Sequence, residues 1–359
     1  MKSMLRYTLF GFLLLIFGSC SQEEPVVTEE PDKVLLSVPF TRAGTLVDEN
    51  RVFTARLIVV RSAGQTNGGQ VLVNSTTPFS VDLVNEAWQT FREMVQVGFI
   101  DLYVFANELS SWNLNAITVG STFNFNTLRA KTFDVTDYPV VDATHGIPAF
   151  AYHQRMHVDV NGVLTYNGST VSLIEVERIF AKVHIKINCD FADLPDNTPI
   201  RLDSVYIRTM PIRSWLIPSF YTLTGSTNFL DGTYYSPTNA FTPPFDDANG
   251  FYHEYVFYIP EYLITDITKY TYITITAHKE ASPFQRFHYK LIVGDGIVSH
   301  TYQQMFETTN TADLRVSRNV WYTLNIVKIT GFGDYDVNTI VLEASVSNWQ
   351  FLPPIPVEG

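Results

Sequence analysis

The closest pair of histidines in the sequence is His153 and His157, in AYHQRMH. On a β-strand the two rings would project from the same side but about 13 Å apart, at a rise of roughly 3.3 Å per residue, which is too far to share one metal ion. On a helix they would lie one turn apart. No HExxH, CxxC or Asp-rich calcium loop accompanies them, so we expect surface histidines and no metal site.

Candidate catalytic groups are equally isolated. Cys189 falls on the apolar face of a predicted strand, where a free thiol behaves as a small buried hydrophobe. The sequence contains no GxSxG, Gly-rich phosphate loop or kinase signature. The carboxylates of FDDANG (Phe245–Gly250) and DYDVN (Asp334–Asn338) sit in stretches typical of solvated turns. We therefore expect no enzymatic activity and no cofactor.

The N-terminus carries the clearest chemistry. Lys2 and Arg6 precede an apolar run, Tyr7–Phe17, and Gly18 and Ser19 place two small residues directly before Cys20. This pattern predicts a secretory signal peptide over residues 1–19. Its ending resembles a lipobox, so signal peptidase II would cut before Cys20 and leave that residue acylated. An uncleaved membrane anchor is the alternative, but the run falls well short of the ~20 residues that span a bilayer.

The residues after Cys20 suggest where the lipoprotein goes. Ser21–Glu24 resembles the acidic signal that sends some lipoproteins to the outer face of a Gram-negative outer membrane. The segment Gln22–Asp32 is acidic and contains two prolines, which is typical of an unstructured tether. We expect an outer-membrane lipoprotein precursor.

The composition predicts a globular protein. Hydrophobic residues make up 46% of the 359 residues, with 26 Phe and 19 Tyr, which excludes intrinsic disorder. A formal net charge of −12 argues against nucleic acid or anionic lipid as a partner. At ~150 residues per domain the chain has room for about two domains. The abundant aromatic rings could line a glycan-binding platform, but their alternation within strands favours core packing.

Apolar and polar residues alternate along most of the chain, which predicts strands. In IFAKVHIKINC the odd-numbered residues from Ala181 to Cys189 form an apolar face, and Lys182, His184, Lys186 and Asn188 form a wet one. Strands are also predicted over 34–40, 53–59, 99–107, 270–279, 287–293, 321–331 and 339–349. Helical patterning is confined to Leu83–Met94 and Tyr302–Glu307. The Gly/Asn-rich stretch Val160–Thr170 precedes a predicted domain boundary near residue 174. The fold class is therefore mainly β, with two Greek-key-like β-sandwich domains and little helix.

Five segments in order resemble the fimbrillins, the lipoprotein-derived major subunits of type V pili. These segments are the lipobox ending at Cys20; a short strand followed by Thr41–Gly44; ENRVFTARLIVV (Glu49–Val60) with DLYVFANE (Asp101–Glu108); VERIFAKVHIKI (Val176–Ile187); and SRNVWYTLNIVKITGFG (Ser317–Gly333) with LEASVSNW (Leu342–Trp349). The resemblance covers nearly the whole chain.

The resemblance implies two transthyretin-like β-sandwich domains, at residues 43–174 and 175–359. It also implies that a trypsin-like protease cuts the lipidated propeptide, residues 20–42, between Arg42 and Ala43. The first strand, Lys33–Thr41, would then leave, and a C-terminal strand of a neighbouring subunit within Gln350–Gly359 would fill its groove. Arg51, Arg56 and Arg61 are less suitable cleavage sites because they flank or interrupt the next strand.

The sequence supports this exchange independently. The first strand presents four apolar residues on one face, at Val34, Leu36, Val38 and Phe40. The C-terminal segment offers a series of the same period, at Phe351, Pro353, Ile355 and Val357. Prolines at 353, 354 and 356 depart from the pattern because each removes a backbone donor. The alternative is that residues 350–359 are a frayed, proline-rich end.

These observations predict a structural subunit of a fimbria, first on the outer membrane as a lipoprotein and then in a surface fimbrium. Its partners would be other fimbrial subunits, a trypsin-like protease, the outer membrane through the lipid, and a host or bacterial surface if the fimbria is adhesive. An accessory tip subunit or adhesin, or an anchor subunit that keeps its lipid, is one alternative. A surface glycan-binding lipoprotein is another, and it would need no cleavage at Arg42.

Overall fold

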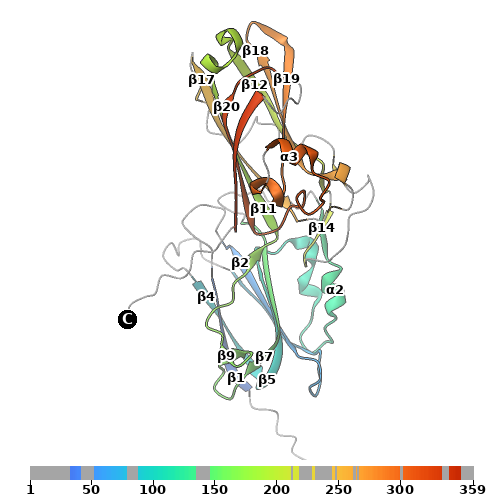
Figure 1. Ribbon diagram of the computed structural model, residues 1–359. Coiled ribbons are helices and arrows are strands. Elements are labelled where there is room, and N and C mark those ends of the chain that lie inside the picture. Colours follow the sequence, from blue (N-terminus) through green and yellow to red (C-terminus); the bar gives the residue numbers. More distant parts are fainter. Residues whose placement is uncertain are drawn as a thin grey trace, which may run out of the picture.

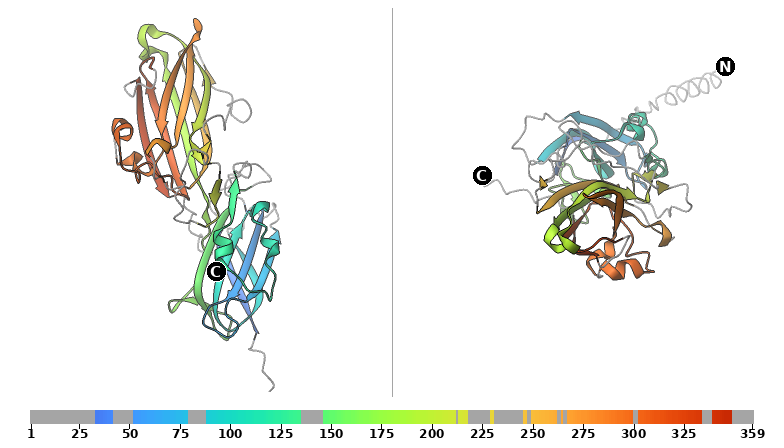
Figure 2. Two further views of the ribbon diagram at one scale, coloured as in Figure 1. Left: turned by 90° about the vertical axis from the view of Figure 1, so that its right-hand side faces the viewer. Right: turned by 90° about the horizontal axis from the view of Figure 1, so that it is seen from above.

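The structure is a computed structural model of two β domains stacked end to end into an elongated molecule (Figures 1 and 2). It describes residues 33–41, 52–78, 88–134, 146–211, 213–217, 229–230, 245–246, 249–261, 264, 267–299, 302–333 and 339–348. The protein is mainly β with few helices, as the sequence predicts. None of the described helices is both long enough and apolar enough to cross a membrane.

The N-terminal domain is built on an antiparallel sheet with the strand order β3-β2-β5-β7-β8-β9, to which β10 adds beside β7. Its strands are β2 (Thr54–Arg61), β3 (Val71–Pro78), β5 (Gly98–Ala106), β7 (Ala149–Val158), β8 (Leu164–Tyr166), β9 (Ser169–Thr170) and β10 (Glu177–Arg178). A two-stranded sheet of β1 (Lys33–Thr41) and β4 (Trp88–Gln96) packs on one face. The other face is covered by η2 (Ser110–Trp112), η3 (Leu114–Ala116), α2 (Phe125–Arg129) and β6 (Thr132–Asp134). The central strand β2 is consequently buried on both faces.

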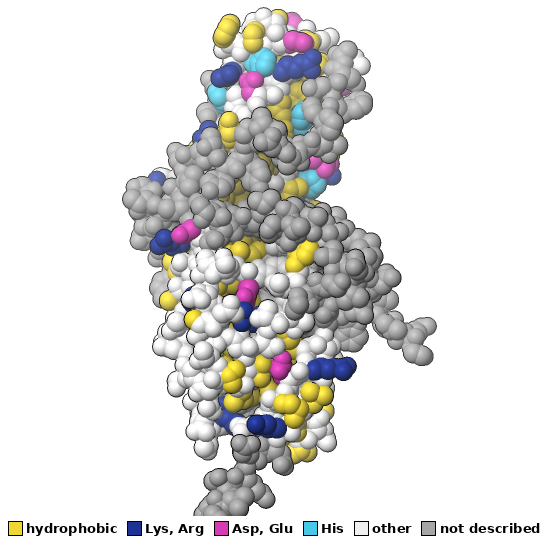
Figure 3. Space-filling model, turned by 180° about the vertical axis from the view of Figure 1, so that it is seen from behind, with side chains coloured by type: hydrophobic (Ala, Val, Ile, Leu, Met, Phe, Trp, Pro, Cys, Tyr) yellow, Lys and Arg dark blue, Asp and Glu magenta, His cyan; other side chains and the backbone are white. Residues whose placement is uncertain are grey.

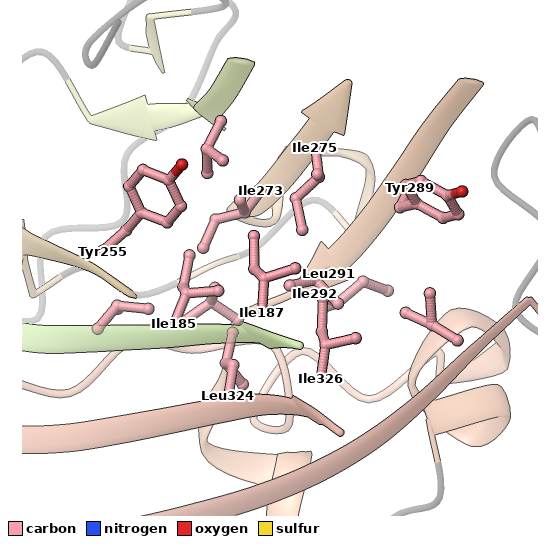
Figure 4. Packing of buried hydrophobic residues seen from close by; sticks show 14 of the residues in the cluster. Ile185, Ile187, Tyr255, Ile273, Ile275, Tyr289, Leu291, Ile292, Leu324 and Ile326 are labelled. Atoms are coloured by element: carbon pink, nitrogen blue, oxygen red, sulfur yellow. The ribbon is translucent and has the colours of Figure 1, made fainter. Parts of the chain in front are cut away.

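The C-terminal domain is a sandwich of a five-stranded and a three-stranded sheet. The larger sheet has the order β16 (Phe245–Asp246), β17 (Gly250–Pro260), β11 (Phe180–Asp190), β20 (Val320–Ile329) and β21 (Ile340–Asn348); the smaller has β12 (Ile200–Arg208), β18 (Tyr272–Lys279) and β19 (Ser282–Ile292). Isoleucine, leucine and tyrosine side chains from both sheets interdigitate between them (Figure 4). The remaining elements are η5 (Phe191–Asp193), η6 (Pro195–Asn197), β13 (Met210–Pro211), β14 (Arg213–Trp215), β15 (Phe229–Leu230), η8 (Ile267–Lys269), η9 (Asp295–Val298) and α3 (Tyr302–Glu307).

The apolar face predicted on β11 is confirmed. Ala181, Val183, Ile185, Ile187 and Cys189 are all at most 1% exposed. The opposite face of β11, predicted to be exposed to solvent, is only partly exposed. Lys182 is 7% exposed because Trp321 of β20 covers it, with the ammonium 4.2 Å from the centroid of the indole ring. That contact is a cation–π interaction, which lets the lysine lie buried.

The helix predicted over Leu83–Met94 is wrong where the chain is described, because Trp88–Gln96 form β4. Phe91 and Val95 stand four residues apart, a spacing that fits one face of a helix and one face of a strand. Pairing with β1 decides between the two by supplying a backbone partner along the whole of β4 and burying both side chains. The predicted helix at Tyr302–Glu307 is present as α3.

The two halves of the chain meet through strand pairing, an exposed ion pair and the hydrogen bonds of the buried Arg318 side chain. β6 of the N-terminal half pairs with β14, and Asp134 accepts from Nε of Arg213 at 2.6 Å. Arg318 donates to the carbonyl of Leu216 at 3.0 Å and to Glu261 at 2.7 Å. A domain boundary at 174/175 stays a prediction. The stretch Val160–Thr170, interpreted as a linker signal, contains the turn before β8 and the β8–β9 hairpin.

Truncating Val183 or Ile185 to Ala should lower the free energy of unfolding by about 2–4 kcal/mol, since each leaves a cavity in the core. Lys186→Ala should cost less than about 1 kcal/mol, because its ion pair with Glu254 is partly exposed. Denaturant titration of the three variants measures the difference. Equal losses in all three would show that the faces of β11 are misassigned.

Candidate functional site

The first strand, β1, is held by a single ladder. It runs antiparallel to β4 from Lys33 opposite Gln96 to Thr41 opposite Trp88. Among the described strands β1 pairs with β4 alone, and β4 pairs with β1 alone. This two-stranded sheet forms the second layer of the N-terminal domain, so β1 is an edge strand that also covers core.

The predicted alternation of β1 is confirmed for residues 34–38. Leu36 and Val38 are fully buried, Val34 is partly buried, and Leu35 on the other face is 51% exposed. The inward side chains pack in a cluster with residues of β2, β4, β5, β7 and β8. Burying a side chain of this size is worth about 1.5–3 kcal/mol, so Leu36 and Val38 are the main apolar anchors. The side chain of Phe40 lies outside the described residues.

A tight turn between β7 and β8 lies in close contact with the backbone of β1. The carboxylate of Asp159 accepts from the backbone N–H groups of Val163 and Asn161, both at 2.8 Å, and these hydrogen bonds lower the pKa of Asp159. Gly162 follows with a φ of +78°, and a Cβ on it would lie 2.2 Å from the carbonyl oxygen of Leu35. Only glycine fits this close approach without a shift of the turn or of β1.

These contacts define a groove between β4 and the 159–163 turn, with β1 as its occupant. If β1 left, β4 would lose its ladder partner and the cluster around Phe91 and Val95 would be uncovered. An uncovered apolar groove beside an unpaired strand edge is a site for β-strand addition. The described geometry of β1 is therefore that of an edge strand whose removal would expose an apolar surface together with the edge of β4.

The other predicted site residues lie outside the described residues. These are Cys20, Arg42, Ala43, Phe351, Pro353, Ile355 and Val357. The described residues nearest to them in the sequence are the ends of β1 and β21. β1 ends at Thr41, the residue before Arg42, and β21 ends at Asn348. Asn348 pairs with Val320, and the adjacent Asn319 donates to Phe180 at the junction of the domains.

The two histidines do not project from the same side. A β-bulge in β7 opposes Leu102 with His153 but Ile100 with Met156, and Arg155 takes a positive φ. His153 therefore faces Tyr166, at 6.2 Å between ring centroids, while His157 packs edge-on to Phe99 at 5.0 Å. Burial lowers the pKa of His153. Among the described residues no three His, Cys, Asp or Glu side chains are grouped to hold a metal.

Cys189 has the environment predicted for a structural thiol. It is 1% exposed within the core of the C-terminal domain. Burial raises its pKa to about 12, so the thiol stays protonated near neutral pH. A protonated, inaccessible thiol is neither a nucleophile nor a metal ligand.

Two parts of the groove, β4 and the 159–163 turn, were not predicted from the sequence. The turn has a local signal, because Asp-x-Asn-Gly at 159–162 is typical of a tight turn. The sequence of β4 contains no local signal that distinguishes a strand from a helix, because its partner β1 lies far away in the sequence.

The chain thus has two stacked β domains, and its first strand completes the core of the N-terminal domain. Among solved structures, two fimbrial proteins have a similar overall fold. The tip fimbrial protein Mfa3 from Porphyromonas gingivalis, with a C-terminal truncation, gives a TM-score of 0.58 at 14% identity, covering 89% of this chain and 100% of that one. The fimbrilin FimA from P. gingivalis W83 gives 0.54 at 13% identity, covering 89% and 98%.

The chain therefore has the fold of fimbrial proteins, which confirms the resemblance at the level of structure. The identities are too low to carry over more than the fold. No protein-family profile matches the sequence. No curated protein is significantly similar to it in sequence.

Replacing Gly162 with Ala should loosen β1. A strained residue costs about 1–3 kcal/mol, so amide exchange of Leu36 and Val38 should speed up about tenfold or more. Hydrogen-exchange mass spectrometry measures this. Gly168→Ala is the matched control, because Gly168 also has a positive φ, +80°, but has open space around its Cβ position. Equal protection of β1 in both variants would mean that the turn does not hold it.

Proposed function

We propose that this protein is a non-enzymatic fimbrial subunit, exported as a lipoprotein and polymerised by strand exchange after proteolysis. The observation that carries the proposal is β1. It covers the core of its domain with two fully buried side chains, pairs among the described strands with β4 alone, and ends directly before Arg42. The shared fold with fimbrial proteins supports the same role.

Cleavage after Arg42 changes the competition for the groove. While the chain is intact, β1 is tethered beside its groove at an effective concentration in the millimolar range or higher, so a strand from another copy is excluded. After the cut, β1 can dissociate. An incoming strand then restores the ladder to β4 and reburies the sites of Leu36 and Val38, and its escape requires opening the sheet.

Two of the alternative arginines, Arg56 and Arg61, are buried, which argues against cleavage at either of them. Arg56 is 4% exposed and donates to Glu108 at 2.8 Å and to Asn74 at 2.6 Å. Arg61 is 7% exposed at the end of β2. A protease would have to unfold the central sheet to reach either residue.

The donor strand is proposed to lie within Gln350–Gly359. Phe351, Pro353, Ile355 and Val357 match the two-residue period of the face that β1 buries. The prolines reduce the hydrogen bonds available to the donor, so its side chains would supply most of the binding. A tip, adhesin or anchor role, and adhesion to a host or bacterial surface, remain alternatives within this proposal.

Two variants test the exchange. Arg42→Ala should give folded monomers that keep residues 20–42, and deletion of Phe351–Gly359 should give cleaved monomers that cannot donate. Both follow from the competition between a tethered strand and a free one. Heat-labile ladders on SDS gels measure polymer formation, and Arg51→Ala is the control that keeps the proposed site intact.

Assembly of Arg42→Ala at the parental rate would contradict cleavage at this site. Long ladders from the deletion variant would contradict the donor assignment. If both occurred, the glycan-binding lipoprotein would become the preferred function.

Export as a lipoprotein has its own test. Cys20→Ala should abolish acylation and reduce surface delivery by tenfold or more, because a lipobox without its cysteine cannot be processed by signal peptidase II. Incorporation of a labelled fatty acid measures the first effect and surface immunolabelling the second. Acyl label that persists in the variant would show that Cys20 is not the acylated residue.

A further inference from the structure

A small hollow lies on the face of the N-terminal domain that is turned away from β1. It has a volume of about 190 Å³ and lies between η3, the segment 121–124 and α2. These elements cover the sheet on the side opposite the groove, so the hollow is separate from the proposed strand exchange. Sites for drug-sized molecules measure ~300–1,000 Å³, so this hollow has room for one small ring.

The walls of the hollow are held in place by the backbone and the core. Phe123 donates its N–H to the carbonyl of Gly69 at 2.6 Å. Its neighbour Thr122 forms an antiparallel bridge with Gln70. On the other side Leu128, 1% exposed, anchors α2 in the core. The hollow is therefore formed before a ligand arrives, which lowers the ordering cost of binding.

Polar side chains that have no partner in the described part of the chain line the hollow. The amide of Asn113 and the hydroxyls of Thr122 and Thr127 make no hydrogen bond with a described residue. Asn113 is held between η2 and η3 in the left-handed conformation, with a φ of 48°. Amides and hydroxyls at fixed positions can both donate to and accept from the hydroxyls of a sugar.

Lys131 adds one positive charge to the lining. Its carbonyl accepts from the N–H of Leu216 at 3.0 Å, which fixes its backbone. Its ammonium forms no ion pair with a described residue, although the chain has a net charge of −12. On the face shown in Figure 3, the N-terminal domain is mainly uncharged, with single charges scattered over it. Such a face offers no charged field for a polyanion, whereas one ammonium suits a ligand with one carboxylate.

Aromatic rings continue from the hollow across the surface. Phe123 lines the hollow, and its ring centroid lies 4.9 Å from that of Tyr103. Tyr152 stacks on Tyr103 at 6.3 Å and lies 5.6 Å from Phe125, and it is 42% exposed. The C–H groups of sugars pack on aromatic faces, so these rings offer a surface for a second sugar unit beside the hollow.

We propose that this hollow, here called the sugar site, binds a pyranose ring that carries a carboxylate, as in the uronic or sialic acid units of surface polysaccharides. Lys131 pairs with the carboxylate, and the side chains of Asn113 and Thr127 bind ring hydroxyls. The charge-assisted hydrogen bond from Lys131 is the strongest of these contacts, so it sets the preference for acidic sugars.

The inference goes beyond the proposed function, because a single copy contains the whole sugar site. One small hollow binds weakly, since it removes little of a ligand from water. A fibre would present one sugar site per subunit, and linking sites in this way raises avidity by about 10²–10⁴ over one site. Weak binding by one copy is therefore enough for adhesion by a fibre.

Ligand-observed NMR on the purified, uncleaved full chain tests the sugar site. The probes are methyl β-D-glucuronide, N-acetylneuraminic acid and methyl β-D-glucoside. At least one of the two acidic sugars should bind about tenfold or more tightly than the neutral glucoside, because only an acidic sugar supplies a partner for Lys131.

Variants assign the binding to the hollow. Lys131→Gln should abolish the preference for the acidic sugar. Arg129→Gln is the matched control, because it removes the same charge from α2 at a residue that does not line the hollow. Asn113→Gly and Thr127→Val should each weaken binding about tenfold, and glycine keeps the left-handed backbone at residue 113. Unchanged melting temperatures show that the variants are folded.

The proposal fails if the parent chain binds neither acidic sugar, or binds the glucoside equally well. It also fails if Lys131→Gln and Arg129→Gln lose the preference to the same extent, or if both hollow variants bind like the parent. None of these residues belongs to β1 or β4, so each of these results leaves strand exchange untouched. Loss of polymerisation in an Arg42→Ala chain that still binds the acidic sugar would support the two proposals separately.

Discussion

The ladder between β1 and β4 is the interaction on which the N-terminal domain depends. Without β1, β4 has no strand partner among the described residues, and the core cluster loses Leu36 and Val38. In an intact chain β1 supplies both the strand partner of β4 and the two buried side chains. Under the proposed function, a chain that has been cut beyond Thr41 and has lost β1 would need another strand of similar pattern to restore both.

The C-terminal domain does not share this dependence. Its two sheets bury a separate core in which β11 lies between β17 and β20. The junction joins this domain to the N-terminal domain, for which strand exchange is proposed, through the β6–β14 pair and the buried side chain of Arg318. The end of β21, from which the proposed donor continues, is held in the larger sheet of the C-terminal domain by its pairing with β20.

Period-two alternation was enough to predict the fold class, the faces of β1 and β11, and the buried state of Cys189. Each of these features is local, because one strand with one apolar face carries its own pattern. β4 could not be predicted, because Phe91 and Val95 fit a helix as well as a strand and only pairing with distant β1 decides. The bulge at Arg155 reverses the expected side of His157, and residue types alone do not locate a bulge.

Only one part of the groove, its occupant β1, could be predicted from the sequence, because only that part has a local pattern. Its occupant has a clear sequence pattern, whereas its walls are assembled from β4 and from a turn that contacts Leu35 through one glycine. Close approach of two backbones leaves almost no signal beyond the glycine itself. Cleavage after Arg42 and donation by residues 350–359 are proposed from the position and packing of β1.

The N-terminal sequence of subunits recovered from surface fibres tests the central claim most directly. If β1 is removed before assembly, subunits from SDS-resistant ladders begin at Ala43 and contain no peptide from Lys33–Thr41. Ladders built from subunits that still carry Lys33–Thr41 in the same polypeptide would contradict the account.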